Sequence, residues 1–194
     1  MARSSSTGKP ASLDFTAYFS SATQLPEPPV LERDRKRYDD MGIIGAQELS
    51  AKGFYASIVR GTPAAPAKPA ADTNVLVVED DAGTAQIVQR VLNAAGYRTR
   101  AAGNRAQIAE ELGRTPQPDL ILLDVVLAPG LSGFDILNKL RQHEGLKHIP
   151  VIMLTSMSKR EHIVQGLGLG ADAYLTKPAR PSALVDAVRT VLAG

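Results

Sequence analysis

From about residue 74 onward, the sequence predicts an α/β fold with a five-stranded, doubly wound parallel sheet. Short apolar runs alternate with stretches of helical spacing, about five times in about 120 residues. The runs are apolar at successive positions, which is typical of strands buried on both faces. Repeated strand–helix alternation favours parallel strands with helices on both sides of the sheet.

The first two strand–helix pairs are expected between residues 75 and 112. A strand at Val75–Val78 is followed by a helix over 82–95, and Gly96 supplies the C-terminal stop. A second strand at Tyr97–Ala101 and a second helix at Arg105–Leu112 follow. The first helix has apolar residues at helical spacing, namely Ile87, Val88, Val91 and Leu92.

The third and fourth pairs follow the same pattern. The sequence DLILL predicts a strand at Asp119–Leu123, and a helix is expected at Phe134–Glu144. The sequence PVIML predicts a strand at Pro150–Leu154, with a helix at Lys159–Leu167. One face of the third helix is apolar and carries Ile136, Leu137 and Leu140.

The last pair is a short strand at Ala173–Leu175 and a helix at Pro181–Leu192. The apolar stripe of that helix is Leu184, Val185, Val188 and Leu192. In such sheets, ligands bind at the carboxyl ends of the strands, near a topological switch point. The chemistry of this chain is therefore expected at its strand ends.

The strand ends carry acids, a hydroxyl and an ammonium group. The first strand leads into Glu79-Asp80-Asp81, the third into Asp124, the fourth into Thr155 and the fifth into Lys177. Adjacent carboxylates repel one another, so a hard cation such as Mg²⁺ is one interpretation of the first group. Capping of a helix N-terminus is the other.

Phosphoryl transfer is the chemistry that suits this set. One carboxylate can attack phosphorus and become an acyl phosphate. A divalent cation held by the other acids, with a lysine and a hydroxyl, can stabilise the remaining phosphoryl oxygens.

Four motifs in order resemble the receiver domain of bacterial two-component response regulators: VLVVEDD, DLILLDVVL, VIMLTS and ADAYLTKP. The resemblance covers about residues 74–194 and implies a flavodoxin-like receiver fold. It also implies a signalling protein whose only chemistry is its own phosphotransfer and dephosphorylation, with a sensor histidine kinase as partner. A cytoplasmic location is expected.

The resemblance assigns a role to each strand-end residue. Asp124 matches the phosphoacceptor and Lys177 the site lysine, while Thr155 and Tyr174 match the switch residues that control a downstream partner. Its Mg²⁺ would be held by Asp80, Asp124 and the backbone carbonyl of Val126, with Glu79 acting through water. The Lys177–Pro178 peptide matches one that is commonly cis in the family.

The loop after Asp124 departs from the family pattern. The family's Pro and Gly usually lie four and eight positions past the acceptor, but here Pro129 and Gly133 lie five and nine positions past it. The loop is therefore expected to be one residue longer. Ala179 also stands where an apolar aromatic residue is common.

The first 73 residues have a different character. An N-terminal arm is expected over 1–60, followed by a Pro/Ala-rich linker over 61–73. The arm holds six of the chain's nine aromatic residues, and disordered tails are poor in aromatic residues. The segment 45–59 has partial helical spacing. Exchange of arms in a homodimer is one hypothesis, and an arm packed on its own domain is the alternative.

Composition excludes several other classes of function. The net charge of +2 gives no reason to expect nucleic-acid binding, and the chain has no cysteine. No apolar run is long enough to span a membrane. His143, His148 and His162 lie away from the strand ends and show no metal-ligand spacing.

Three other functions use a similar fold or similar chemistry. An aspartate-nucleophile phosphatase usually has a second Asp two positions after the nucleophile, where this chain has Val126. A flavin binder of the same fold needs a phosphate loop after the first strand, where this chain has three acids. A scaffold that is not phosphorylated is the remaining alternative.

Overall fold

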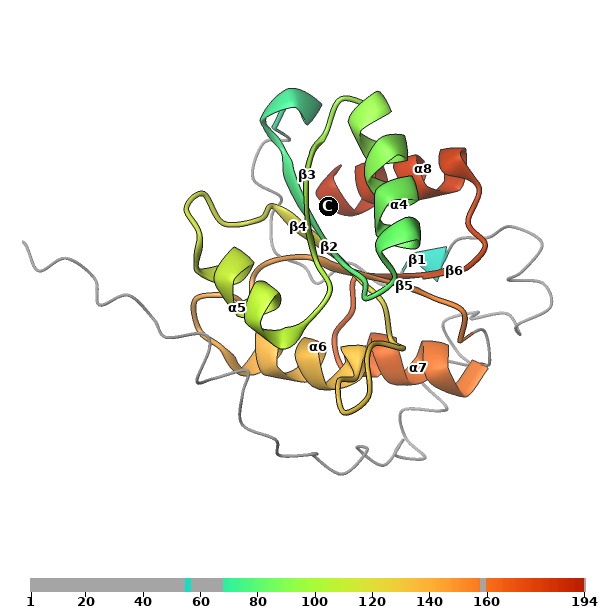
Figure 1. Cartoon of the computed structure of the whole chain (residues 1–194). Helices are drawn as coiled ribbons and strands as arrows, with labels where there is room; N and C mark the ends of the chain where they lie inside the picture. Colours follow the sequence, from blue (N-terminus) through green and yellow to red (C-terminus); the bar gives the residue numbers. More distant parts are fainter. Residues whose placement is uncertain (1–54, 57–67, 158–159, 194) are drawn as a thin grey trace, which may run out of the picture.

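Five parallel strands form the centre of the protein (Figure 1). The computed structural model describes residues 55–56, 68–157 and 160–193. The parallel strands lie in the order β3-β2-β4-β5-β6. Their bounds are β2 Asn74–Val78, β3 Arg98–Ala102, β4 Leu120–Leu123, β5 Val151–Thr155 and β6 Ala173–Thr176. The predicted fold class is confirmed, and each predicted strand lies within one residue of its observed bounds.

Helices cover both faces of the sheet, as Figure 1 shows. Helices α4 (Ala82–Ala94) and α8 (Pro181–Ala193) lie on one face. The other face carries α5 (Arg105–Gly113), α6 (Gly133–Gln142) and α7 (Arg160–Gly168). Two apolar clusters fill the two interfaces, because the strand side chains point alternately to opposite faces. None of the helices in the described ranges has both the length and the apolar character to cross a lipid bilayer.

Polar side chains fix the starts of three helices. The side chains of Asp81, Asn104 and Ser132 accept hydrogen bonds from backbone N–H groups in the first turns of α4, α5 and α6. Each cap satisfies a donor that the helix leaves without an internal partner. The capping interpretation of the acidic triplet therefore holds for its third member, Asp81.

A sixth strand, β1 (Tyr55–Ala56), was not predicted. It pairs with β6 in antiparallel fashion, with Tyr55 opposite Tyr174 and Ala56 opposite Ala173. Partial helical spacing suggested a helix at 45–59, and for Tyr55–Ala56 that prediction is wrong. The physical reason is that β6 would otherwise be an edge strand with unpaired backbone groups.

Of the predicted linker over 61–73, the structure describes only residues 68–73. Ala70–Asp72 form a short 3-10 helix, whereas an extended segment was expected. The remainder of the arm and of the linker, residues 1–54 and 57–67, lies outside the described residues.

Candidate active site at the carboxyl edge of the sheet

The register of the strands brings the predicted residues to one edge of the sheet. Val78 of β2 is paired with Leu123 of β4, so Glu79 and Asp124 leave neighbouring strands at the same level. The order of the strands reverses between β2 and β4, and crevices of this kind hold ligands in open α/β sheets. Lys177 joins the same edge, because its N–H donates to the carbonyl of Thr155 at 2.8 Å.

Lys177 links the two buried carboxylates. Its Nζ donates to Asp124 Oδ2 at 2.5 Å and also to Glu79 Oε2. Glu79 and Asp124 are each only 6% exposed. Two acids therefore share one ammonium group in a place that water reaches poorly, and the cluster is short of positive charge.

The pKa shifts agree with this charge balance. Burial raises the pKa of the Glu79 carboxyl, and the charge of Asp124 raises it further, against the opposing effect of Lys177. Burial works against the charged form of Lys177, but hydrogen bonds to Asp124 and Glu79 outweigh it and raise the pKa of the ammonium group. The lysine stays charged, and the excess negative charge makes ionisation of Glu79 less favourable.

The three consecutive acids have separate positions. Glu79 is buried against Lys177, and its Oε1 accepts the N–H of Asp81 at 3.4 Å. Asp81 caps α4 through a 2.7 Å bond from the N–H of Thr84, and this bond lowers the pKa of Asp81. Asp80 lies exposed between them. Sequence spacing alone could not separate these positions.

Side chains alone do not form a metal cage. In the described ranges, no group of three or more His, Cys, Asp or Glu residues is placed to hold a metal ion. Lys177 already occupies an oxygen of Glu79 and one of Asp124, which leaves Asp80, Asp124 and the Val126 carbonyl as candidate oxygen donors. Few protein oxygens plus several waters suit Mg²⁺, and the shortage of positive charge favours a cation.

The β4–α6 loop, residues 124–132, fixes the Asp124 carboxylate. The N–H of Val126 donates to Asp124 Oδ1 at 3.1 Å. Val126 and Ser132 form an isolated antiparallel bridge that closes the base of the loop. A Cβ at Gly133 would lie 2.0 Å from the Asp124 carbonyl oxygen, so any side chain there would displace the backbone.

A tight turn occupies the tip of this loop. The N–H of Leu131 donates to the Ala128 carbonyl at 3.0 Å, with Pro129 and Gly130 between them. Gly130 has φ of +79°, which suits the third position of a type II turn. The tip of the loop is thus closed by a Pro-Gly turn, while Gly133 keeps its close contact with Asp124.

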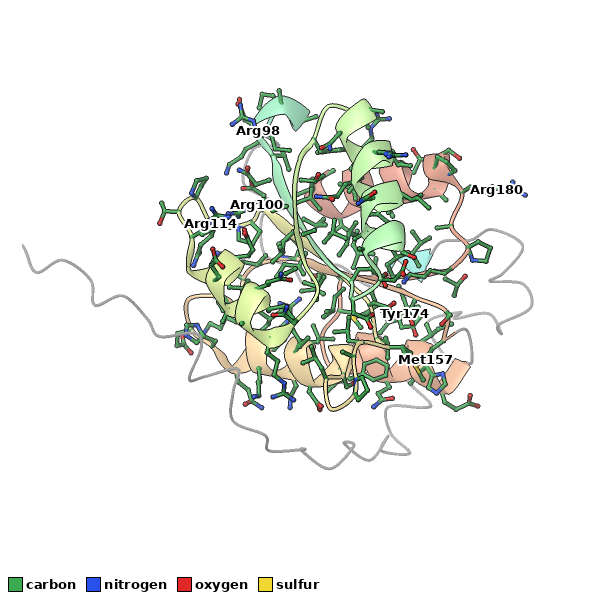
Figure 2. The ribbon with its side chains drawn as sticks, in the orientation of Figure 1. Arg98, Arg100, Arg114, Met157, Tyr174 and Arg180 are labelled. Carbon is green, nitrogen blue, oxygen red and sulfur yellow. The ribbon has the colours of Figure 1, made fainter. Side chains whose placement is uncertain are left out.

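The two predicted switch residues both contact Met157. Thr155 is fully buried, and its Oγ1 accepts the N–H of Met157 at 3.2 Å. The hydroxyl of Tyr174 donates to the Met157 carbonyl at 2.7 Å, and Figure 2 shows the two residues close together. The Tyr174 ring is fully buried, and burial raises the pKa of its hydroxyl. The aromatic ring therefore already lies inside the protein.

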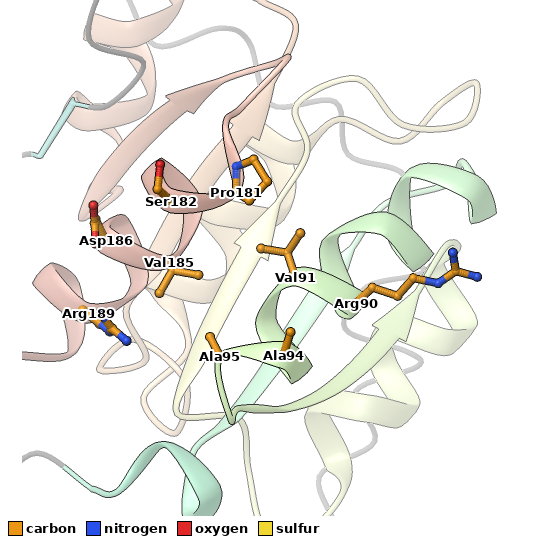
Figure 3. Close-up of a pocket in the computed structure, with 9 residues that line it drawn as sticks. All are labelled: Arg90, Val91, Ala94, Ala95, Pro181, Ser182, Val185, Asp186 and Arg189. Atoms are coloured by element: carbon orange, nitrogen blue, oxygen red, sulfur yellow. The ribbon is translucent and has the colours of Figure 1, made fainter.

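A separate hollow lies between two helices. A pocket of about 560 Å³ opens between α4 and α8 (Figure 3). Val91 and Val185 face each other across it, and Arg90 and Arg189 lie at its borders. None of its lining residues comes from the strand ends, so this pocket is separate from the candidate site.

The predicted site residues gather at this edge, but their contacts were only partly foreseen. The Lys177–Pro178 peptide is cis, as the resemblance implied. The bridge from Lys177 to Glu79 was missed, because the resemblance assigned Glu79 to the metal. The role of Gly133 was also missed, although its spacing from Asp124 was the available signal.

Comparison with known proteins points to one family. Residues 75–189 match the model of the response regulator receiver domain. The chain is 40% identical over 118 residues to the phosphate regulon transcriptional regulatory protein PhoB of Pseudomonas aeruginosa, covering 61% of this chain and 51% of that protein. It is also 40% identical over 118 residues to the DNA-binding response regulator MtrA of Mycobacterium tuberculosis, covering 61% of this chain and 50% of that protein. The chain thus spans about half the length of the curated relatives it matches.

Solved structures show the same fold. A putative response regulator from Chloroflexus aurantiacus aligns with TM-score 0.59 and 34% identity, covering 66% of this chain and 100% of that chain. The chemotaxis protein CheY4 of Vibrio cholerae aligns with TM-score 0.57 and 29% identity, covering 62% of this chain and 98% of that chain. Both alignments are limited to about two thirds of this chain.

Proposed function

This chain belongs to the response regulator receiver family of two-component signalling systems, and on that basis we propose that Asp124 accepts a phosphoryl group from a sensor histidine kinase. The observation that carries the proposal is the position of the Asp124 carboxylate. Asp124 leaves the sheet at the switch point, with one oxygen bonded to the Val126 N–H and the other to Lys177.

The proposed reaction is a substitution at phosphorus. A carboxylate oxygen of Asp124 forms a bond to phosphorus while the bond from phosphorus to the kinase histidine nitrogen breaks, and the product is an acyl phosphate. Lys177 is held beside the attacking group, so its ammonium group can shift its hydrogen bond from the Asp124 carboxylate to a phosphoryl oxygen. Thr155 supplies a hydroxyl at the neighbouring strand end.

Mg²⁺ is the proposed cofactor. Asp80, Asp124 and the Val126 carbonyl would hold it directly, and Glu79 would act through water because Lys177 and the Asp81 N–H already use its oxygens. When bound, the ion neutralises negative charge on the transferring group. The donor types fit this hard cation, and the shortage of positive charge in the cluster supports its binding.

Two exposed apolar side chains suggest where a kinase docks. In the described ranges, the exposed large hydrophobic residues are Ile87 on α4, at 63%, and Val126 in the β4–α6 loop, at 54%. Val126 is two residues from Asp124, and α4 begins directly after the acidic triplet. A partner that delivers a phosphoryl group to Asp124 would cover both side chains. On this proposal the transfer takes place in the cytoplasm, and the chain catalyses only its own phosphotransfer and dephosphorylation.

The proposed output runs through Thr155 and Tyr174. A phosphoryl group on Asp124 would accept a charge-assisted hydrogen bond from the Thr155 hydroxyl, and would thus compete with the Met157 N–H, which donates to the same hydroxyl oxygen, for the orientation of that side chain. Met157 is also held by Tyr174, so this competition would be transmitted to β6 and the downstream partner that contacts it. The downstream partner is expected to be a protein.

The N-terminal arm is proposed to be a protein-contact element. Its described strand β1 extends the sheet beside β6, which supports packing of the arm on its own receiver. The same backbone pairs could form between two copies, because thirteen residues separate β1 from Ala70 and span up to about 40 Å when extended. Exchange of β1 in a homodimer therefore remains the concentration-dependent alternative. Comparing the mass of the full chain with a chain lacking residues 1–60 across micromolar concentrations separates the two arrangements.

Phosphorylation tests the proposal directly. Acetyl phosphate or a phosphorylated kinase should label the full chain when Mg²⁺ is present, and chelation of Mg²⁺ should prevent labelling. Intact-mass measurement should show one added phosphoryl group that hydroxylamine removes, and peptide mapping should place it on the peptide containing Asp124. Labelling of Asp124→Asn at the wild-type level would refute the assignment.

A further inference from the structure

The β4–α6 loop is fixed at its base and exposed at its tip. The base is held by the bridge between Val126 and Ser132 and by a 2.9 Å bond from the Gly133 N–H to the Val125 carbonyl. Pro129 and Gly130 at the tip are exposed.

A side chain from another helix reaches this tip. Arg105 is the first residue of α5, and its Nη2 donates to the carbonyl oxygen of Gly130, 25 positions further along the chain. Helices α5 and α6 lie on the same face of the sheet (Figure 1). Burial lowers the pKa of Lys139 on α6, and the charge of Arg105 lowers it further, which also places the guanidinium group near α6.

The loop that Arg105 holds carries two atoms of the proposed site. The Val126 N–H orients Asp124 Oδ1, and the Val126 carbonyl is the proposed backbone ligand of Mg²⁺. Val126 is bridged to Ser132 across the loop, so a shift of the tip at Gly130 would be passed to both atoms. Apolar packing of Leu127 and Leu131 also holds the loop, but it restrains side chains and does not fix the tip carbonyl.

We propose that Arg105 is a positioning residue of the phosphoacceptor site, which anchors the tip of the β4–α6 loop and thereby places the Val126 backbone for Asp124 and Mg²⁺. This inference rests on the proposed function, because it deepens the account of the same site. It concerns a residue that touches neither the phosphoryl group nor the metal, and that acts through the loop.

The sign of one measurement separates positioning from simple charge. If Arg105 acted only as a nearby positive charge, removing it would tighten the binding of Mg²⁺. If it positions the loop, Arg105→Ala should weaken Mg²⁺ binding about three- to tenfold, as expected for a lost hydrogen bond from a charged group at a partly exposed site. Calorimetric titration of the unphosphorylated full chain with MgCl₂ measures this without any activity assay.

Two further variants control for charge and for folding. Arg98, on β3, forms an exposed ion pair with Asp72. Arg98→Ala changes the net charge by the same amount as Arg105→Ala, and should leave Mg²⁺ binding as in wild type. Arg105→Lys keeps the charge and one donor, and should bind Mg²⁺ with an affinity between those of Arg105→Ala and wild type. Thermal unfolding of all variants should show that the receiver remains folded.

Amide spectra give a second readout. In Arg105→Ala, the largest shifts before any Mg²⁺ is added should fall on Val126, Gly130 and their neighbours in the loop. The wild-type chain should bind Mg²⁺ and beryllofluoride, a mimic of the phosphoryl group. If it does, and Arg105→Ala binds Mg²⁺ as tightly as wild type or more tightly, the inference is overturned and the proposed function stands. A wild-type chain that binds neither overturns the proposed function, and the inference with it.

Discussion

Arg141 at the amino edge of the sheet and Lys177 at its carboxyl edge make opposite kinds of charged cluster. The Arg141 guanidinium donates to Asp172 Oδ2 at 2.9 Å, to the Gly170 carbonyl at 2.8 Å and to the Ile149 carbonyl at 2.8 Å. Asp172 Oδ2 also accepts the N–H of Val151 at 2.8 Å. This cluster pairs one acid with one base and joins α6 to the segments that precede β5 and β6.

The carboxyl edge has two buried acids for one ammonium group. Glu79 and Asp124 share Lys177, and the exposed Asp80 adds a further negative charge beside them. A balanced, fully bonded cluster stabilises the fold, whereas an unbalanced one leaves an oxygen nucleophile and an attraction for cations. The charge balance of a cluster therefore separates a structural role from a chemical one.

The largest effect is expected from Asp124→Asn. It should abolish phosphoryl uptake from acetyl phosphate, because the nucleophilic oxygen is lost, while the free energy of unfolding stays equal or rises. Stability should not fall, because the substitution removes one of the two acids that share Lys177 and so relieves the excess negative charge. Uptake is measured by intact mass and stability by urea unfolding. Asp186→Asn, at an exposed position on α8, should behave as wild type in both. A clear loss of stability in Asp124→Asn would assign a structural role to the carboxyl edge.

Arg141→Ala should give the reverse pattern. Because it removes the guanidinium group that donates to Asp172 and to two carbonyl groups at a site where the Arg141 side chain is 9% exposed, the free energy of unfolding should fall by about 2–4 kcal/mol. Phosphoryl uptake at a temperature where the variant is folded should match wild type. Lys147→Ala breaks only the exposed pair with Glu144 and should change the free energy of unfolding far less. Equal costs for the two variants would contradict the structural role of the Arg141 cluster.

A smaller effect is expected from the apolar residues beside the acceptor. Val126 and Met157 offer no group to orient or deprotonate a water that attacks the acyl phosphate. Replacing them with Asn and Glu should speed dephosphorylation by at least about tenfold. The decay of the labelled protein after removal of the phosphoryl donor measures this rate.

Apolar replacements serve as the control for that variant. Val126→Ala with Met157→Leu should keep the slow wild-type decay, because neither residue can act on water. A double variant with Asn and Glu that decays no faster than this control would show that these positions do not limit hydrolysis.

The smallest effect concerns the pH dependence of stability. The folded-state pKa of Glu79 is raised above its unfolded value, so the folded form holds its proton more tightly. The stability linked to this group is fully present below the unfolded pKa of 4.5 and is lost as pH rises through the folded pKa. Glu79→Gln should therefore flatten the decline of stability in the window just above pH 4.5. Urea unfolding at intervals from pH 4 to pH 7 gives the comparison with wild type.

The same experiment has a clear contrary result. If stability of the wild type rises across that window and Glu79→Gln removes the rise, then the carboxylate is stabilised by Lys177 more than it is penalised by burial. The carboxyl edge would then be a balanced ion pair like the Arg141 cluster, and the contrast between the two edges would fail.

Much of the fold and the membership of the site followed from sequence order. Apolar periodicity depends on neighbouring residues, so the five strand–helix pairs were predictable from Val75 to Leu192. Caps are equally local, and Asp81 was recognised as a candidate N-cap. Parallel strands place their carboxyl ends at one edge, so Asp124, Thr155 and Lys177 could be expected to meet there before any contact was known.

Contacts between distant residues were decided only by the tertiary structure. Lys177 meets Glu79 across 98 positions of the chain and Asp124 across 53, whereas Asp80 stays exposed. Tyr55–Ala56 became a strand because the edge of β6 offered backbone partners, against the local helical spacing. Arg105 reaches Gly130 because α5 and α6 share a face of the sheet. Such contacts depend on which surfaces packing brings together, and the spacing of residues along a chain does not specify that.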